Sequence, residues 1–433
     1  MYIYTTHITP RLQYVANFLQ QQIFTQPVLL VTSLENIDGS QIIINYSDEI
    51  LAVSSINIQP HSLLFETGVQ PQNITCFEVG GMKAFFNTAG DIPFDIFAAS
   101  FYLLSRYEEY LPYTADAFSR YPHTEALAYK EIFLQQPLVN NWWQYFAKRV
   151  NEKLSLTLAI KNNFTFLPTY DIDIAWSYKN KGFWRNAGGW CKDLLQGKFS
   201  LLSKRIAVLR GKQKDPYDAY AWLNQLHEKY YLKPYYFFLL AHKRTQYEKN
   251  IAPDNKQLIA LINDHFIRYP VGIHPSWNSS LKENVLTKEI QTLAHIAGKT
   301  IQASRQHYIK FTLPQTYRQL LQQGILFDFS MGYGSINGFR ASVASPFYWY
   351  DVEREQQTDL LLFPFCFMDA NAFYEIKHTA EEALAEMKTL YGKVKNVNGL
   401  FSMIWHNNFL GSEPVFTEWK KVYEAFVQWQ SEQ

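Results

Sequence analysis

From residue 164 to the C-terminus, short apolar runs alternate with segments in which apolar residues recur at helical spacing. The segments with helical spacing predict helices over 218–231, 255–266, 280–297, 314–324 and 380–392. The apolar runs predict strands over 164–170, 235–241, 271–274, 301–311, 325–329, 360–367 and 400–406. Strands that alternate with helices usually form a parallel sheet with helical crossovers, so this pattern predicts an α/β fold. About seven strands in about 270 residues further predict a deformed (β/α) barrel.

Residues 1–162 lack this alternation and mix strand-like runs with helical ones. The clearest helix is predicted over 93–110, with Asp91 as its N-cap and with Phe94, Phe97 and Phe101 on its buried face. We therefore predict an N-terminal α+β domain over 1–162 and the barrel over 163–433. The pattern leaves open whether the first domain is a lid, a dimer interface or a partner-docking surface.

Local signals also predict where the helix over 280–297 begins and ends. Ser280 and Glu283 form a capping-box pattern, in which the two side chains would bond the backbone of the first turn. Gly298 is the expected end of that helix, because glycine readily adopts the left-handed conformation that closes a helix.

The composition is close to neutral and rich in aromatic residues. There are 40 Lys and Arg against 39 Asp and Glu, a net charge of +1, and charged residues make up 18% of the chain. Overall charge therefore gives no electrostatic reason to expect a nucleic-acid or anionic-membrane partner. The 11 Trp, 29 Tyr and 32 Phe exceed the needs of one ordinary core and require an explanation.

Targeting and membrane signals are weak in this chain. No apolar run approaches the roughly 20 residues that span a bilayer, and the N-terminus lacks a basic stretch followed by an apolar one. The three cysteines, Cys76, Cys191 and Cys366, are far apart, which argues against a disulfide framework and a structural zinc site. These features predict a cytoplasmic protein without a membrane span.

Polar and titratable residues gather at the ends of the predicted strands. In a (β/α) barrel the active site lies where the strands end and the loops begin. Several acidic and basic side chains at one such edge are therefore a candidate site. They are Asp171, Asp173, His242, His274, Arg305, His307, Asp328 and His406.

The pair Asp171 and Asp173 points to a metal ion. Residues two apart in an extended strand project to the same side, and two close carboxylates repel each other unless a cation lies beside them. A divalent cation satisfies this need, with one carboxylate as ligand and the other free to act as a base. His274 ends a short strand, and a histidine in that position is a natural metal ligand beside the two carboxylates.

Several segments together resemble polysaccharide deacetylases of the NodB-homology, carbohydrate esterase 4-like family. They resemble in particular a Bacteroidetes-type branch with an extra N-terminal domain of unknown function. The segments are TYDIDIAWSYKNKG (169–182), GIHPSW (272–277), SRQHY (304–308), FDFSMGY (327–333) with GFRAS (338–342), WHN (405–407) and, in the N-terminal region, FDIFAASFYLLSRYEEY (94–110). The resemblance covers nearly the whole chain.

This resemblance implies a metal-dependent hydrolase that removes N- or O-acetyl groups from a carbohydrate or another small acetylated substrate. The cation would be Zn²⁺, with Co²⁺ or Ni²⁺ as alternatives. The implied roles are Asp171 as general base, Asp173 and His274 as metal ligands, Arg305 as the partner that orients Asp171, the Tyr308 backbone N–H as an oxyanion donor, Asp328 as the group that orients the last histidine, and His406 as general acid.

One departure from the family pattern leaves the third metal ligand undetermined. The family has a second histidine four residues after the first, where this chain has Asn278, and His307 stands in place of a proline in the third motif. Either His307 replaces the missing ligand, or Asn278 or water completes the shell, or the site holds no catalytic metal. In the last case the domain would bind carbohydrate without cleaving it.

Further side chains near the predicted edge could bind the substrate. Trp277, Tyr333 and Trp405 could stack on sugar faces, and Arg340 could bind an anionic group. Rival functions fit less well. A D-x-D glycosyltransferase or a two-carboxylate glycosidase would leave the histidines without a role. A phosphatase of the D-x-D-x-T type would need another residue at Ala175.

Overall fold

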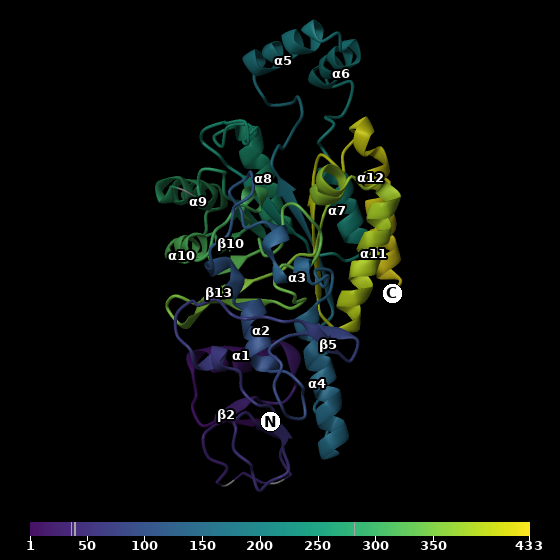
Figure 1. The fold of residues 1–433 in the computed structure, drawn as a ribbon. Coiled ribbons are helices and arrows are strands. Elements are labelled where there is room, and N and C mark those ends of the chain that lie inside the picture. Colours follow the sequence, from purple (N-terminus) through teal and green to yellow (C-terminus); the bar gives the residue numbers. More distant parts are fainter. Residues whose placement is uncertain (36, 39, 281) are drawn as a thin grey trace.

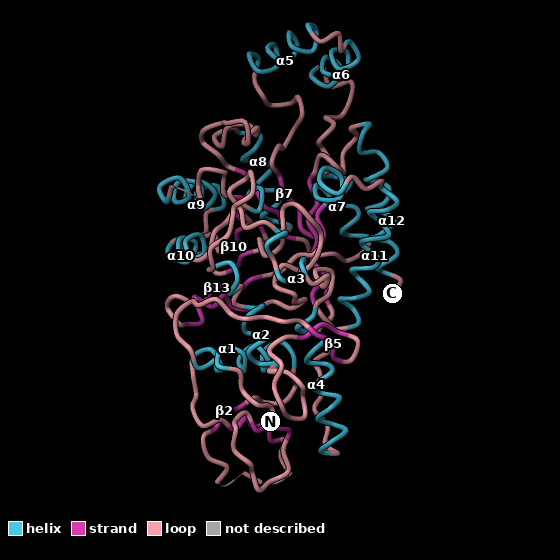
Figure 2. The backbone as a smooth tube through the Cα atoms, in the orientation of Figure 1, coloured by secondary structure: helices cyan, strands magenta, loops and turns pink. Residues whose placement is uncertain are grey.

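A nine-stranded sheet forms the centre of the C-terminal region (Figures 1 and 2). The computed structural model describes residues 1–35, 37–38, 40–280 and 282–433. The strand order is β12-β13-β11-β10-β9-β8-β7-β15-β14, and all neighbours are parallel except β12 and β13. The strands are β7 (Thr165–Ile172), β8 (Tyr235–Leu239), β9 (Val271–His274), β10 (Ala303–Ser304), β11 (Phe327–Asp328), β12 (Phe347–Asp351), β13 (Gln356–Leu362), β14 (Phe367–Met368) and β15 (Leu400–His406).

The parallel α/β arrangement agrees with the sequence prediction, but the closed barrel does not. In the described residues, no strand pairing joins β14 to β13 or β12. The single strand predicted over 360–367 is broken, because Pro364 has no N–H to donate to a sheet. The intervening chain crosses the gap instead. The Phe363 N–H donates to the Asp328 carbonyl on one side, and the Cys366 N–H donates to the Ser402 carbonyl on the other.

Helices cover the sheet in the order that the alternation predicts. The helices are α7 (Tyr220–Lys229), α8 (Lys256–Arg268), α9 (Glu283–Ala297), α10 (Gln315–Gln322), α11 (Ala380–Asn396) and α12 (Thr417–Ser431). Gly298, with φ +64°, ends α9 as expected. The capping box does not form: α9 begins at Glu283 without a side-chain cap, and the Ser280 hydroxyl donates to the Trp277 carbonyl instead.

A helical hairpin interrupts this pattern between β7 and α7. It consists of α5 (Phe183–Leu195) and α6 (Phe199–Leu209), which the sequence analysis did not predict. Figure 1 shows the hairpin standing clear of the body at one end of the molecule, far from the N-terminus.

The N-terminal region has its own parallel sheet, in the order β2-β1-β3-β4, and a β5–β6 hairpin. The strands are β1 (Tyr2–Tyr4), β2 (Leu29–Val31), β3 (Ile43–Asn45), β4 (Ile56–Asn57), β5 (Phe77–Val79) and β6 (Met82–Ala84). The helices are α1 (Pro10–Phe18), α2 (Ile96–Leu104), α3 (Leu127–Lys130) and α4 (Leu138–Leu154). The region thus mixes helices and short strands, and its four-stranded sheet is parallel, with α1 between β1 and β2, whereas the sequence predicted an α+β domain.

Helix α2 is shorter than the helix predicted over 93–110. Its N-cap is Asp95, whose carboxylate accepts hydrogen bonds from the N–H groups of Phe97 and Ala98, each at 2.9 Å. Asp91, the predicted cap, accepts from the Asn57 N–H and pairs with Lys153 instead. The left-handed backbone of Arg106 separates the helix from a 3₁₀ turn at 107–110.

The two regions share one continuous apolar core. Tyr14 of α1 and Phe101 of α2 pack on Tyr350 of β12, with ring centroids 5.0 and 5.1 Å away. Aromatic pairs of this kind occur throughout the core, which accounts for much of the aromatic surplus. None of the helices in the described ranges is both long enough and apolar enough to traverse a lipid bilayer.

Candidate metal centre and catalytic pocket

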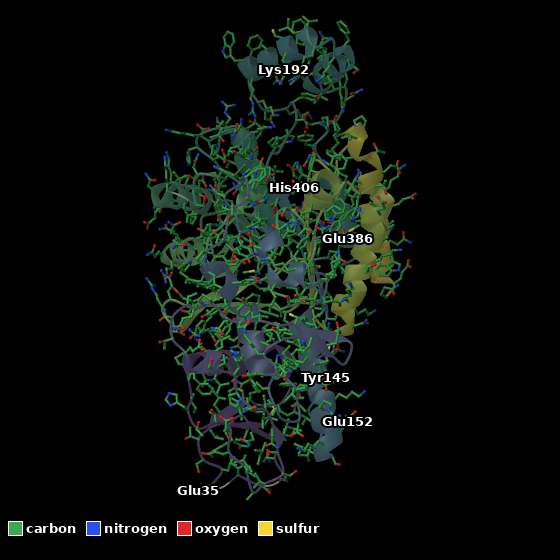
Figure 3. All side chains as sticks on the ribbon, viewed as in Figure 1. Glu35, Tyr145, Glu152, Lys192, Glu386 and His406 are labelled. Carbon is green, nitrogen blue, oxygen red and sulfur yellow. The ribbon has the colours of Figure 1, made fainter. Side chains whose placement is uncertain are left out.

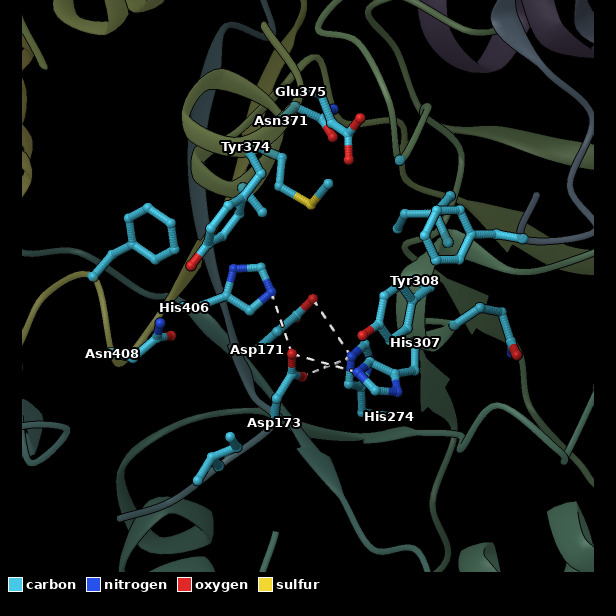
Figure 4. A pocket seen from close by; sticks show the side chains of 18 of the residues that line it. Asp171, Asp173, His274, His307, Tyr308, Asn371, Tyr374, Glu375, His406 and Asn408 are labelled. Carbon is cyan, nitrogen blue, oxygen red and sulfur yellow. Dashed lines mark ion pairs between the residues drawn. The ribbon is translucent and has the colours of Figure 1, made fainter. Parts of the chain in front are cut away.

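A pocket of about 340 Å³ opens at the carboxyl ends of β7, β9, β10 and β15. Figure 3 places His406 within the body of the molecule, and Figure 4 shows the pocket and most of its side chains. Parallel pairing brings His406 of β15 beside Asp171 of β7, and it aligns β9 so that His274 ends at the same edge. The polar residues at the ends of these strands therefore lie at one edge of the sheet, as expected.

Asp171 is buried and held by an arginine. Its Oδ1 atom lies 3.3 Å from Nη1 of Arg305, which is also fully buried and donates to Thr169 Oγ1 at 2.7 Å. Arg305 Nε donates to the Phe329 carbonyl, so the guanidinium is fixed on two sides. These contacts match the orienting role that the resemblance implied for Arg305.

Asp173, His274 and His307 form a compact cluster of possible metal ligands, in which the ligand atoms all lie within 4.8 Å of one another. The Nε2 atom of His274 is 3.1 Å from Asp173 Oδ1, and the Nε2 atom of His307 is 3.4 Å from Asp173 Oδ2 (Figure 4). Asn278 is not part of this cluster. Of the two protein ligands left open by the sequence, the geometry favours His307.

The hydrogen bonds of His274 show why a cation fits this cluster. Its Nδ1 atom lies 2.6 Å from the Arg305 carbonyl and must therefore carry a proton, which leaves Nε2 with a lone pair when the ring is neutral. That lone pair faces the Asp173 carboxylate, whose Oδ1 atom is buried and has no hydrogen-bond partner. Two facing acceptors need either a proton or a cation between them. The spacings of 3.1 and 3.4 Å are close to the roughly 3.3 Å between ligands around tetrahedral zinc.

Charge around the cluster favours binding of a cation. Burial tends to raise the pKa of Asp173, but His307 and His274 outweigh it and hold that pKa well below its usual value. Burial likewise tends to lower the pKa of His274, and the Asp171 and Asp173 carboxylates raise it instead. The Asp173 carboxylate thus remains negative in the pocket.

His406 is oriented by Asp369, and not by Asp328 as predicted. The Asp369 carboxylate accepts from His406 Nδ1 and from the His406 backbone N–H, both at 2.7 Å. Burial tends to lower the pKa of His406, but Asp369 outweighs it and raises the pKa to about 10. Asp328 is buried against the hydroxyls of Ser304 and Ser330.

Asp369 was missed, although a signal for it exists. It directly follows the two-residue strand β14, so the strand-end argument that selected the other residues applies to it as well. The strand predicted over 360–367 ends one residue before β14 does, and β14 is too short to stand out by itself.

None of the four predicted substrate residues lines the pocket. Tyr333 and Trp405 are buried in the core, and Arg340 forms a buried ion pair with Glu109 from the 3₁₀ turn after α2. Arg340 is therefore a structural group. Trp277 stacks on Tyr247 with ring centroids 3.9 Å apart, outside the set of lining residues.

The N-terminal region supplies part of the pocket wall, which the sequence did not predict. Arg120 Nη1 donates to the Tyr308 carbonyl at 2.7 Å, and Asp116 holds the same guanidinium at 2.8 Å. Phe118 stacks on the ring of Tyr308 at 5.5 Å. Both Phe118 and Arg120 line the pocket. Tyr308 itself has a left-handed backbone, with φ +59°, and these contacts support it.

Comparisons with known proteins give one family model and several solved structures. Residues 1–155 match the model of a family of unknown function, DUF7033. No curated protein matches the chain. Solved structures with a similar chain arrangement include proteins described as polysaccharide deacetylases from Mycobacterium smegmatis, Pseudomonas aeruginosa PAO1 and Bacillus cereus. Their sequence identities are 12%, 11% and 11% and their TM-scores 0.40, 0.40 and 0.30. They cover 63%, 62% and 62% of this chain and 86%, 85% and 88% of their own.

Proposed function

We propose that the pocket binds a divalent metal ion and hydrolyses N- or O-acetyl groups of a carbohydrate. One observation carries the proposal: three possible metal-ligand groups lie close together between a carboxylate held by Arg305 and a histidine held by Asp369. The pocket therefore combines a cation site, a base and an acid in about 340 Å³. That combination is what hydrolysis of an acetyl group requires.

Asp173, His274 and His307 would hold the ion. A divalent ion bound there would act as a Lewis acid on water and on the acetyl carbonyl. Zn²⁺ suits a set of two imidazoles and one carboxylate, and Co²⁺ or Ni²⁺ can occupy similar sites.

Asp171 is suited to act as the base. Its Oδ1 atom is turned to Arg305, while Oδ2 faces the ligand cluster, 3.9 Å from His274 Nε2. In this position Asp171 accepts a proton from a water molecule in the pocket as the water oxygen attacks the acetyl carbonyl. The Tyr308 backbone N–H would donate to the oxygen that becomes negative, a contribution worth about 3 kcal/mol for a good donor.

His406 is suited to act as the acid. Asp369 binds its Nδ1 side, so the proton on Nε2 is the one that faces the pocket, 3.6 Å from Asp173. With its pKa raised to about 10, His406 is protonated at neutral pH. It gives that proton to the leaving nitrogen or oxygen of the sugar as the acyl bond breaks, and the products are acetate and the deacetylated sugar.

The non-catalytic alternative loses its main support. It was based on the asparagine at position 278, which left one ligand missing. His307, from the segment after β10, lies 3.4 Å from Asp173 and would supply a third protein ligand.

Metal binding by paired variants tests the ligand set. After chelator treatment, Zn²⁺ affinity is measured by calorimetry for His307→Ala and, as the control, Asn278→Ala. His307→Ala should weaken binding by more than the 10- to 100-fold expected for a residue that only supports a ligand. Asn278→Ala should leave affinity within about 3-fold, below the roughly 10-fold lower limit for such residues. The reverse order would refute the assignment.

Acetate release tests the reaction itself. Metal-loaded protein should release acetate from acetylated amino-sugar oligomers or from an O-acetylated glycan. Asp171→Asn should abolish release and retain the metal. A metal-loaded protein that binds these glycans without releasing acetate would overturn the catalytic proposal and establish the binding alternative.

A further inference from the structure

The near-zero net charge hides a strong local excess of positive charge. Between Lys179 and Lys214, the segment that contains α5 and α6, there are ten Lys and Arg residues and one acidic residue, Asp193. This segment has a formal charge of +9, so the rest of the chain has −8 to give the total of +1. Asp193 is already paired with Arg205 at 2.7 Å, which leaves the other basic side chains without an acidic partner inside the segment.

The same hairpin exposes large apolar side chains. It holds 8 of the 20 exposed large apolar residues in the described part of the chain, in 27 positions. Trp184 is 85% exposed and Leu195 is 88% exposed. None of the residues of α5 is buried. A protein normally buries such side chains or uses them at an interface.

The apolar and basic residues lie on different faces of α5. Phe183, Trp190 and Leu194 recur at intervals of seven and four and therefore share one face. Arg185 and Lys192 are also seven apart and lie on another. Figures 1 and 3 show the hairpin, with Lys192 labelled, projecting from the body into open space.

We propose that the α5–α6 hairpin docks this protein on the surface of a membrane that contains anionic lipids. Helices with basic side chains on one face and Trp, Phe and Leu on another lie in the plane of the bilayer interface. At 13 residues, α5 is about 20 Å long and cannot span the roughly 30 Å hydrocarbon layer, so the hairpin lies on the membrane. The positive charge complements anionic headgroups, and the apolar face enters the boundary between headgroups and acyl chains. This proposal does not depend on the activity proposed above.

The position of the hairpin relates docking to the pocket. The hairpin is inserted between Asp173 and Tyr217, which both line the pocket. Lys204 also pairs with Glu413 at 3.2 Å, which ties the base of the hairpin to the body. Docking would therefore fix the distance of the pocket from the bilayer.

Vesicle sedimentation with the full chain tests this proposal. The protein should bind phosphatidylcholine vesicles containing about 30% phosphatidylserine and should not bind phosphatidylcholine alone. Binding should weaken strongly between about 0.05 and 0.5 M salt, because salt screens exposed charges. The double variant Lys192→Glu, Lys198→Glu should weaken binding by at least about 30-fold, since each basic residue near the surface contributes about 5-fold.

Matched variants separate the hairpin from the rest of the surface. Trp184→Ser with Leu195→Ser should reduce binding at least 10-fold, consistent with loss of buried apolar area. Tyr231→Ser with Ile267→Ser removes residues of similar exposure elsewhere, 91% and 83%, and should have no effect. Equal losses in the two pairs, or no binding to anionic vesicles, would overturn the proposal. If the protein does not bind the vesicles but forms a dimer through the hairpin, or binds a single-stranded RNA, the proposal is also overturned.

Discussion

The buried charges between the two regions give a sharp prediction about stability. Glu109 lies between Arg106 and Arg340, and the exposed fractions of the three side chains are 2%, 1% and 1%. Its carboxylate accepts from Arg106 Nε at 2.7 Å and from Arg340 Nε and Nη2 at 2.9 and 2.6 Å. We therefore choose Glu109→Gln, which keeps the size of the side chain and removes its charge.

The expected loss follows from these contacts. Glutamine offers one oxygen and one NH₂ group, so an amide donor would face an arginine donor in a buried site. Arg106 and Arg340 would also lose the charge that compensates their burial. Breaking a buried ion pair in this way typically costs about 3–5 kcal/mol. We expect a decrease of that size in the free energy of unfolding.

Urea unfolding at neutral pH, followed by tryptophan fluorescence and by circular dichroism, measures this loss. The control is Glu418→Gln, which breaks the exposed pair with Lys421 and should cost less than about 1 kcal/mol. Burial tends to raise the pKa of Glu109, but Arg340 and Arg106 outweigh it and lower that pKa. The stability that Glu109 contributes is therefore present above its unfolded pKa, and the difference from the variant should shrink only as the pH falls through the lowered folded pKa. A loss in Glu109→Gln no larger than in the control would refute the reasoning.

Three further predictions concern the pocket and the core. Asp369→Asn should reduce acetate release by about 100-fold or more and leave metal content unchanged, because His406 loses the group that orients it and raises its pKa; loss of the metal would contradict this role. Arg120→Ala should lower kcat by about 10- to 100-fold at unchanged metal content, because the support of Tyr308 and its N–H is lost; an unchanged kcat would show that the wall has no such role. Burial lowers the pKa of His265 to about 4, so the unfolded state binds its proton first as the pH falls below 6.5. The free energy of unfolding of His265→Leu relative to the wild type should then rise by about 1.4 kcal/mol per pH unit between pH 6.5 and 4. Urea titrations at several pH values would measure this difference, and a difference that does not change with pH would contradict the prediction.

The strand-end argument found much of the candidate site because strand register is a local property. Asp171, Asp173, His274 and His406 each lie at or just beyond the end of a strand whose apolar run is visible in the sequence. Parallel pairing then brings these ends together, with no further information needed. Asp369 escaped this argument because its strand has only two residues.

Contacts between distant segments could not be predicted in this way. Arg120 and Tyr308 are 188 positions apart, and no periodic pattern connects them. Arg340 and Glu109 are 231 positions apart, so an exposed binding role for Arg340 was as plausible from the residues as a buried structural one. The strands of the N-terminal sheet have two or three residues each, too few to show alternation.

The wall formed by Phe118 and Arg120 has a consequence for how selectivity could change. These residues touch the pocket from outside the sheet that carries the metal ligands, and they lie in a loop without regular structure. Substitutions in that loop can reshape the entrance while the ligands, base and acid keep their places. The first 160 residues would thus provide an adjustable surface beside the proposed catalytic groups. They also carry Glu109 and Arg120, so a fragment that starts at residue 163 would lose the buried partner of Arg340 and the support of Tyr308, and it should not retain the pocket.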